Sequence, residues 1–355
     1  MSITRLARAA IRDLRPYEAA IQVDDTIRLN ANEAPWRNSA DHFHRPLNRY
    51  PEIRPARLRA LLAERYGCAP ENLLVTRGTS EAIDLLMRVF CTAGVDNIVT
   101  TFPTFSMYEH YAVVQGAELR QVETDGDNDF LVAAESVLTA CDDGTKIVFL
   151  CSPNNPTGTL VPRDTLLRIL EDRKDRSIVV VDEAYIEFSG AGSATDLIPS
   201  FENLVVLRTL SKALAFAGAR CGSVIGNKRI VDILDAVQAP YALATPVVEC
   251  VENALANESL ADAEHCVAET INERARLRAE LEKFSFVSRV WPSAANFLLV
   301  EVVDPAALML HCAKDGLLLR HFAGQLANCV RITVGTPEEN ARLVESLGRL
   351  EDKDG

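Results

Sequence analysis

Between residues 72 and 230, short apolar runs alternate with segments in which apolar residues return every three or four positions. The run NLLVTRG (72–78) is followed by TSEAIDLLMRVFC (79–91), whose apolar residues at 83, 86, 87 and 90 fall on one face of a helix. The runs KIVFL (146–150) and IVVV (178–181) are almost wholly apolar, which is typical of parallel strands covered on both faces. This alternation predicts an α/β sandwich with a mostly parallel central sheet. Strands are expected within 72–78, 97–103, 117–123, 146–153, 177–188 and 203–212.

The pattern changes after residue 246. Residues 247–284 form one long helical pattern rich in Ala, Glu and Arg, and two or three strand-like runs follow between 284 and 336. We therefore expect a large α/β domain at 44–260 and a smaller α+β domain at 261–355. Residues 1–43 are expected to form an N-terminal arm and part of the small domain, because they are too few for a core of their own.

Composition and charge disfavour several classes of function. The 355 residues carry a net charge of −13, which repels nucleic acid. No apolar run reaches the roughly 18 residues that cross a bilayer, and the first residues lack the apolar core of a signal peptide. Nine cysteines stand singly without a CxxC pair, and six histidines lack ligand spacing. We expect a cytoplasmic protein with reduced thiols, no metal site, and no nucleic-acid or membrane partner.

Groups able to bind an anion and a ring follow the predicted strands, where ligands of open α/β sheets bind. Gly78, Thr79 and Ser80 open the helix after the first strand, and the N–H groups of a helix start bind anions. Phe105 follows the next strand, and the turn SPNNPTG can aim the amide of Asn155 at a ligand oxygen. Taken singly, each feature also fits an ordinary helix cap, turn or core aromatic.

A carboxylate and a lysine stand where burial is expected. Asp182 directly follows the apolar run 178–181, and Lys212 lies among small and apolar residues in LRTLSKALAFAGARCG (207–222). A lone buried charge is costly unless it is paired or neutralised. Pyridoxal phosphate would satisfy both, because its pyridinium nitrogen takes a carboxylate and its aldehyde takes a lysine as a Schiff base.

The sequence also resembles the fold-type I aminotransferases, and among them the bacterial histidinol-phosphate aminotransferases. The wider group is marked by SPNNPTG and by a serine–lysine pair with an arginine eight positions later. Within that group, the histidinol-phosphate aminotransferases are indicated by the segments LNANE (29–33), NRYP (48–51) and RITVGT (331–336). The resemblance covers nearly the whole chain. It implies a pyridoxal-phosphate enzyme that moves the amino group between L-histidinol phosphate and 2-oxoglutarate, giving imidazole acetol phosphate and L-glutamate, in L-histidine biosynthesis.

The resemblance implies a role for each matching residue. Lys212 would form the Schiff base and shuttle the proton, Asp182 would pair with the pyridinium nitrogen, and Tyr185 would bond the phenolic oxygen. The remaining cofactor contacts would come from Gly78, Thr79, Ser80, Phe105, Asn155, Thr209, Ser211, Arg220 and, across a homodimer interface, Tyr50. The anionic end of the substrate would be bound by Tyr17, Arg320 and Arg331, and Asn32 and Tyr50 would belong to the same substrate site. Relatives often carry tyrosine at the position of Phe105.

Other functions remain open at this point. The cofactor residues do not separate this enzyme from aminotransferases for aromatic or other amino acids, or from a lyase such as threonine-phosphate decarboxylase. A regulator with a degenerate aminotransferase-like domain is disfavoured, because the arm before Leu29 is too short for a DNA-binding module. A nicotinamide-binding domain is disfavoured, because no GxGxxG follows a predicted strand.

Overall fold

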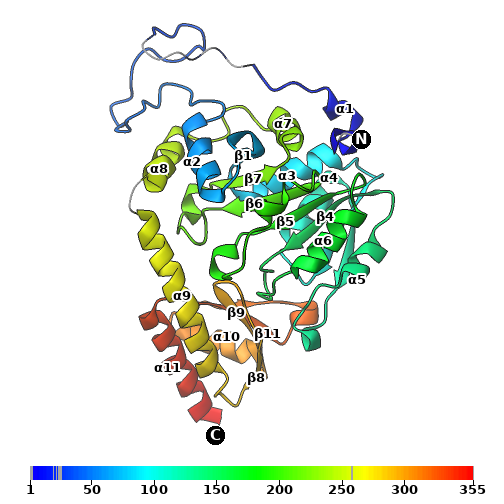
Figure 1. The fold of residues 1–355 in the computed structure, drawn as a ribbon. Helices are drawn as coiled ribbons and strands as arrows, with labels where there is room; N and C mark the ends of the chain where they lie inside the picture. The colour runs from blue at the N-terminus through cyan, green and yellow to red at the C-terminus, as the bar shows by residue number, and fades with distance from the viewer. Residues whose placement is uncertain (1–2, 19, 21, 23–25, 257–258, 355) are drawn as a thin grey trace.

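The computed structural model of the chain describes residues 3–18, 20, 22, 26–256 and 259–354. Two sheets with helices packed against them make up the molecule (Figure 1). The larger sheet has seven strands in the order β1-β7-β6-β5-β4-β2-β3. These strands are β1 (Leu73–Thr76), β2 (Asn97–Phe102), β3 (Glu118–Glu123), β4 (Thr145–Cys151), β5 (Ile178–Asp182), β6 (Leu204–Thr209) and β7 (Gly222–Gly226).

The large sheet is parallel except for β7, as the apolar runs predict. Strands β3, β2, β4, β5 and β6 pair in parallel, whereas β7 pairs antiparallel with both β6 and β1, so that β1 points the same way as β6. Strand β7 was not predicted, because its sequence GSVIG is short and has glycine at both ends. Gly222 is needed there, since a β-carbon at this position would lie 2.9 Å from the backbone of Gly78.

Helices cover both faces of the large sheet and make three layers. One face packs against α2 (Ala56–Tyr66), α5 (Ala134–Ala140), α6 (Arg163–Asp172) and α8 (Thr245–Ala256). The other face packs against α3 (Gly78–Phe90), α4 (Met107–Gln115) and α7 (Lys228–Val237). In β5, Val179 and Val181 join the first core while Ile178 and Val180 join the second, which explains why this strand is apolar at every position.

The smaller sheet is antiparallel, with the order β10-β11-β9-β8. Its strands are β8 (Val287–Val290), β9 (Phe297–Val302), β10 (Arg320–His321) and β11 (Cys329–Thr333). Leu277 and Leu281, near the end of α9 (Ser259–Leu281), join its core together with α10 (Pro305–Lys314) and α11 (Pro337–Asp354). The helical pattern at 247–284 is therefore two helices, α8 and α9, rather than one; residues 257–258 between them lie outside the described residues. The predicted domain boundaries stay predictions.

The first described residues pack against helices of the large sheet. Ile3 and Ala7 join the core formed with α3 and α7, and the backbone N–H of Arg8, just before α1 (Ala9–Arg12), donates to Val89 O at 2.9 Å. The described residues between 13 and 55 form neither helix nor strand, and Figure 1 shows this arm crossing the end of the large domain farthest from the small domain. Within the described parts of the chain, no helix combines the length and the apolar character that a membrane span requires.

Candidate active site

The carboxyl ends of β1, β2, β4, β5 and β6 lie at one edge of the large sheet, because these strands point the same way. A cavity of about 130 Å³ lies there. It is lined by Thr79, Ser80, Phe105, Cys151, Asn155, Asp182, Ala184, Tyr185, Thr209, Ser211, Lys212 and Arg220. The structure thus brings together every cofactor residue expected from the sequence except Gly78 and Tyr50. Gly78 is packed against the guanidinium of Arg220, which does line the cavity.

One end of this cavity has the groups that bind an anion. Helix α3 starts there at Gly78 (φ +74°), and the N–H groups of a first helical turn have no partners within their helix. Thr209 Oγ1 donates to Ser211 Oγ at 2.9 Å, and Arg220 Nη1 lies 3.5 Å from the same oxygen. Asp182 is the one acidic residue among the described lining residues, so hydroxyl groups and a guanidinium dominate this end.

Asp182 is a buried carboxylate that forms no ion pair with any described residue. Only 2% of it is exposed. Its Oδ2 accepts a hydrogen bond from Tyr108 Oη at 3.0 Å, and its Oδ1 accepts one from the backbone N–H of Ala184 at 3.2 Å. Burial raises the pKa of Asp182 to about 6, even though both hydrogen bonds act to lower it. A cation bound at this carboxylate would remove the cost of burying it.

Lys212 lies across the cavity, with Nζ 5.7 Å from the centre of the Tyr185 ring. The Tyr185 ring in turn packs edge-on against Phe297 at 5.2 Å. Burial lowers the pKa of Lys212, and the positive charges of Arg331 and Arg220 lower it further. An amine with a lowered pKa is neutral at a lower pH than usual, and the neutral form is the nucleophile and the base.

A second cavity of about 440 Å³ shares Phe105 and Asn155 with the first, and Arg331 lies in its wall. Arg331 also contacts the shared wall. Its Nη1 donates a hydrogen bond to Asn155 Oδ1, and its guanidinium lies 5.3 Å from the centre of the Phe297 ring. Arg320 is directly opposite Arg331 in the β10–β11 register. Like charges at this spacing repel each other, so an anion held by both guanidinium groups would be stabilising.

Comparison with known proteins agrees with this geometry. The family model for aminotransferase class I and II matches residues 24–347. The chain belongs to this family. It is 43% identical over 352 residues to the histidinol-phosphate aminotransferase of Xylella fastidiosa (98% of this chain, 96% of the relative). It is 41% identical over 355 residues to histidinol-phosphate aminotransferase 1 of Pasteurella multocida (99% of this chain, 100% of the relative).

Solved structures support the fold. A crystal structure of histidinol-phosphate aminotransferase from Sinorhizobium meliloti in complex with pyridoxal 5′-phosphate superimposes with a TM-score of 0.77, at 22% identity, over 87% of this chain and 84% of that one. The family and the fold class predicted from the sequence motifs are both confirmed.

Three residues expected in the substrate site of this aminotransferase lie elsewhere in the chain. Tyr17 is 61% exposed, and Asn32 (φ +55°) is in the N-terminal arm. Tyr50 is 49% exposed and its ring stacks on Tyr241 at 4.6 Å. None of the three lines either cavity at Lys212. A single chain therefore does not bring them to the lysine.

Two residues of the aminotransferase site were not identified from the sequence. Tyr108 bonds Asp182 from the buried side, stacked on Phe149 at 4.8 Å, and Cys151 lies opposite Asp182 in the β4–β5 register. The sequence signal for Tyr108 is an aromatic residue three positions after Phe105, within the first turn of α4 that follows β2. Cys151 could have been located from its position at the end of the same apolar run that precedes Asn155.

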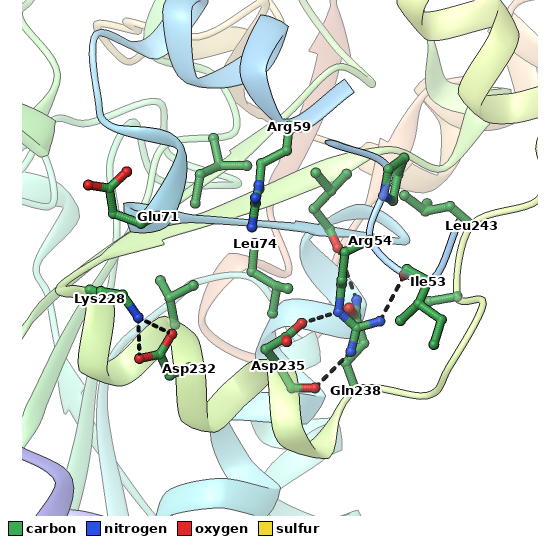
Figure 2. Close-up of a pocket in the computed structure, with 15 residues that line it drawn as sticks. Ile53, Arg54, Arg59, Glu71, Leu74, Lys228, Asp232, Asp235, Gln238 and Leu243 are labelled. Carbon is green, nitrogen blue, oxygen red and sulfur yellow. Dashed lines mark hydrogen bonds and ion pairs between the residues drawn. The ribbon is translucent and has the colours of Figure 1, made fainter. Parts of the chain in front are cut away.

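Another cavity, of about 230 Å³, lies between α2, α7 and the outer edge of β1 (Figure 2). None of its lining residues carries a hydroxyl group or an aromatic ring, and two of its cations pair with its own carboxylates, Arg54 with Asp235 and Lys228 with Asp232. It therefore lacks the set of groups found at Lys212. Among the described residues, no three His, Cys, Asp or Glu side chains are grouped as a metal ion would require.

Proposed function

We propose that this aminotransferase moves the amino group from L-histidinol phosphate to 2-oxoglutarate, giving imidazole acetol phosphate and L-glutamate, as a step of L-histidine biosynthesis. One observation carries the proposal: the cavity that contains Lys212 and the unpaired Asp182 adjoins a cavity that contains two arginines. The first has the groups for a cofactor, and the second has the groups for the anionic end of a substrate. The names of the relatives at 41–43% identity support the same reaction.

The residues present fit pyridoxal phosphate as the cofactor. The hydroxyl groups of Thr79, Ser80, Thr209 and Ser211, the guanidinium of Arg220 and the start of α3 would hold its phosphate. Asp182 would pair with its ring nitrogen. This carboxylate is buried without a cation among the described residues, and a pyridinium would supply one. Asn155 and Tyr185 would bond its phenolic oxygen, and Phe105 would pack on its ring.

Lys212 would perform the proton transfer. Bound pyridoxal phosphate supplies an electron sink for the electron pair that is left when the substrate α-proton departs. Lys212, whose pKa is lowered by burial and by Arg331 and Arg220, would take that proton in its neutral form and later return it. Tyr185, 8% exposed beneath Nζ, limits the positions that the amine can adopt.

Arg331 and Arg320 would bind both substrates in turn. A planar guanidinium can bond a phosphate ester or a carboxylate in the same two-pronged way, so one pair of arginines can accept histidinol phosphate and then 2-oxoglutarate. Because both substrates use one site, we expect ping-pong kinetics. Arg331 Nη1 donates a hydrogen bond to Asn155 Oδ1. When the anion binds, Arg331 would either give up this hydrogen bond or keep it and bond the anion as well.

We further propose a homodimer in which Tyr50 of one subunit completes the site of the other. In the single chain Tyr50 is half exposed and does not line the Lys212 cavity, yet its segment NRYP is part of the family resemblance. Tyr17 and Asn32 in the same arm would act with it. The cytoplasmic location expected from the sequence stays a prediction.

Substrate comparison tests the proposal. We would measure kcat/KM for histidinol phosphate, histidinol, phenylalanine and phosphothreonine, each with 2-oxoglutarate, and assay carbon dioxide with phosphothreonine. The proposal expects histidinol phosphate to exceed histidinol by about 100-fold or more, because loss of the phosphate leaves two arginines without their anion. A preference for phenylalanine would indicate an aromatic aminotransferase, and release of carbon dioxide would indicate a lyase; either would overturn the substrate assignment.

A further inference from the structure

We infer that Glu33 is a positioning residue for Tyr50: its carboxylate holds the loop that presents Tyr50 to the partner subunit. The inference rests on the proposed homodimer and adds to it a residue to which the family resemblance gave no role. Glu33 belongs to the segment LNANE, and Tyr50 belongs to NRYP, 17 residues later.

The carboxylate of Glu33 is buried and fully engaged. Its side chain is 2% exposed. Oε1 accepts hydrogen bonds from the backbone N–H of Tyr50 at 2.8 Å and from Arg28 Nη2 at 2.6 Å. Oε2 accepts one from Arg49 Nη1 at 2.9 Å. Two guanidinium groups compensate the burial of one carboxylate, and charge-assisted bonds of this length are among the strong ones in proteins.

These bonds take the place of a sheet or helix. The described residues between 13 and 55 contain no regular secondary structure, so the backbone around Tyr50 has no ladder of hydrogen bonds to fix it. Glu33 ties three points of this arm, at residues 28, 49 and 50, to one carboxylate. Fixing an otherwise irregular loop before assembly lowers the entropy lost when it enters a partner's site.

A second contact anchors the far side of the same loop. Arg54 pairs with the side chain of Asp235 on α7 and donates from Nη2 to Asp235 O at 2.7 Å (Figure 2). Between the two anchors, the Tyr50 ring stacks on Tyr241 and stays 49% exposed. The loop is therefore held at both ends, and its tyrosine does not line the Lys212 cavity of its own chain.

Glu33→Gln tests the local role. Glutamine keeps the size of the side chain but loses the charge that holds Arg28 and Arg49. We expect faster hydrogen–deuterium exchange in a peptide covering residues 48–52 and a roughly tenfold or larger rise in the cofactor concentration needed for half-saturation. Asp196→Asn is the matched control, because it removes one charge from the exposed pair with Arg163, at 2.7 Å, away from the arm. Unchanged exchange and unchanged cofactor affinity in Glu33→Gln would overturn the inference.

Hybrid dimers test the action across the interface. Lys212→Ala chains keep an intact arm, and Glu33→Gln chains keep an intact lysine. Random pairing should place one complete site in each hybrid, restoring up to roughly a quarter of the wild-type rate, above the sum of the two parents. A mixture no more active than that sum would show that Glu33 does not act on the partner's site, and the inference would fail.

The two proposals can fail separately. Wild-type enzyme that is inactive on histidinol phosphate would refute the proposed function, whereas the exchange of the Tyr50 peptide and the cofactor affinity would still report on Glu33. If Glu33→Gln does not fold, as judged by its thermal unfolding, Glu33→Asp replaces it. That variant keeps the charge on a shorter side chain, so we expect a smaller change in the same two readouts, and no change would again count against the inference.

Discussion

Gly78 and Arg220 occupy adjoining positions that leave no room for a side chain on the glycine. A β-carbon at residue 78 would lie 2.6 Å from Arg220 Nη2 and 3.2 Å from its Cζ. Gly78 also has a φ of +74°, a conformation that other residues adopt only with strain. The glycine thus allows α3 to start against the guanidinium and lets Arg220 reach the anion-binding end of the cavity.

Gly78→Ala should therefore weaken cofactor binding more than it weakens the fold. The positive φ alone costs on the order of 1 kcal/mol of folding free energy, and displacement of Arg220 adds a loss of cofactor affinity. Gly190→Ala is the matched control, because Gly190 has a φ of +70° and no atom within 4 Å of its added β-carbon. Thermal unfolding and a cofactor titration of both variants give the measurement. Equal cofactor affinities in the two variants would argue against the role of Arg220.

Asp182→Asn should stabilise the cofactor-free protein at neutral pH. The folded-state pKa of Asp182 is about 6, above its ordinary 3.8, so the folded chain holds this proton longer than the unfolded chain does. The free energy of unfolding consequently falls as pH rises from about 4 to about 6, and a neutral asparagine avoids this loss. Above pH 6 the variant should gain up to about 3 kcal/mol, and the gain should vanish below about pH 4.

Urea denaturation of both cofactor-free proteins at several pH values would measure this difference. Saturation with pyridoxal phosphate should shrink or reverse it, because a pyridinium would pair with the aspartate but not with asparagine. A difference that does not depend on pH would contradict the buried, unpaired state of Asp182.

Arg331→Gln should lower kcat/KM for both substrates by about 10- to 100-fold, since each loses charge-assisted bonds to its anion. Arg331 also lowers the pKa of Lys212, so that pKa should rise in the variant. Because Lys212 must be neutral to take a proton, the acidic limb of the rate profile should move to higher pH. Arg289→Gln, in the same small sheet but paired with Asp129, is the control. A lower rate with an unchanged pH–rate profile would show that Arg331 does not influence the protonation of Lys212.

Arg208→Met should destabilise the fold strongly. Arg208, next to Thr209 in β6, is 8% exposed, pairs with Glu183 and Glu187 at 3.5 and 2.7 Å, and covers the ring of Tyr66. Removing it leaves Glu183, itself 2% exposed, buried without its cation, at a cost of about 3–5 kcal/mol. Chemical denaturation measures the loss. Adding Glu183→Gln to Arg208→Met should restore part of it, and strictly additive losses would show that the pair is not coupled.

The sequence predicts the large sheet well where burial dictates composition. Strand β5 is apolar throughout because Val179 and Ile178 face different cores, and that pattern is visible without a structure. Strand β7 gives no such signal, since close approach to Gly78 requires glycine at its start. Among the strand-like runs between 284 and 336 is LLLRHF (317–322), but β10 covers only Arg320–His321, and Leu318 is exposed, so apolar character at that position does not reflect burial.

Most of the candidate site could be predicted because its residues follow parallel strands. The contacts that the sequence could not supply join distant segments. Tyr108 and Asp182 are 74 residues apart, and Arg331 and Asn155 are 176 apart. Neither pairing has a local pattern, and both depend on how the elements pack. For Tyr50 the reason is different, because its proposed site lies in a second chain.

A single half-reaction tests the central claim most directly. Purified enzyme loaded with pyridoxal phosphate would be mixed with histidinol phosphate without any oxo-acid, the absorbance of the bound cofactor would be followed, and the released cofactor would be identified. Lys212→Ala, which should bind cofactor but not turn over, is the control. We predict one equivalent of pyridoxamine phosphate and of imidazole acetol phosphate per site in the wild type and none in the variant. A cofactor left unchanged by histidinol phosphate, but converted by another amino donor, would contradict the proposed reaction.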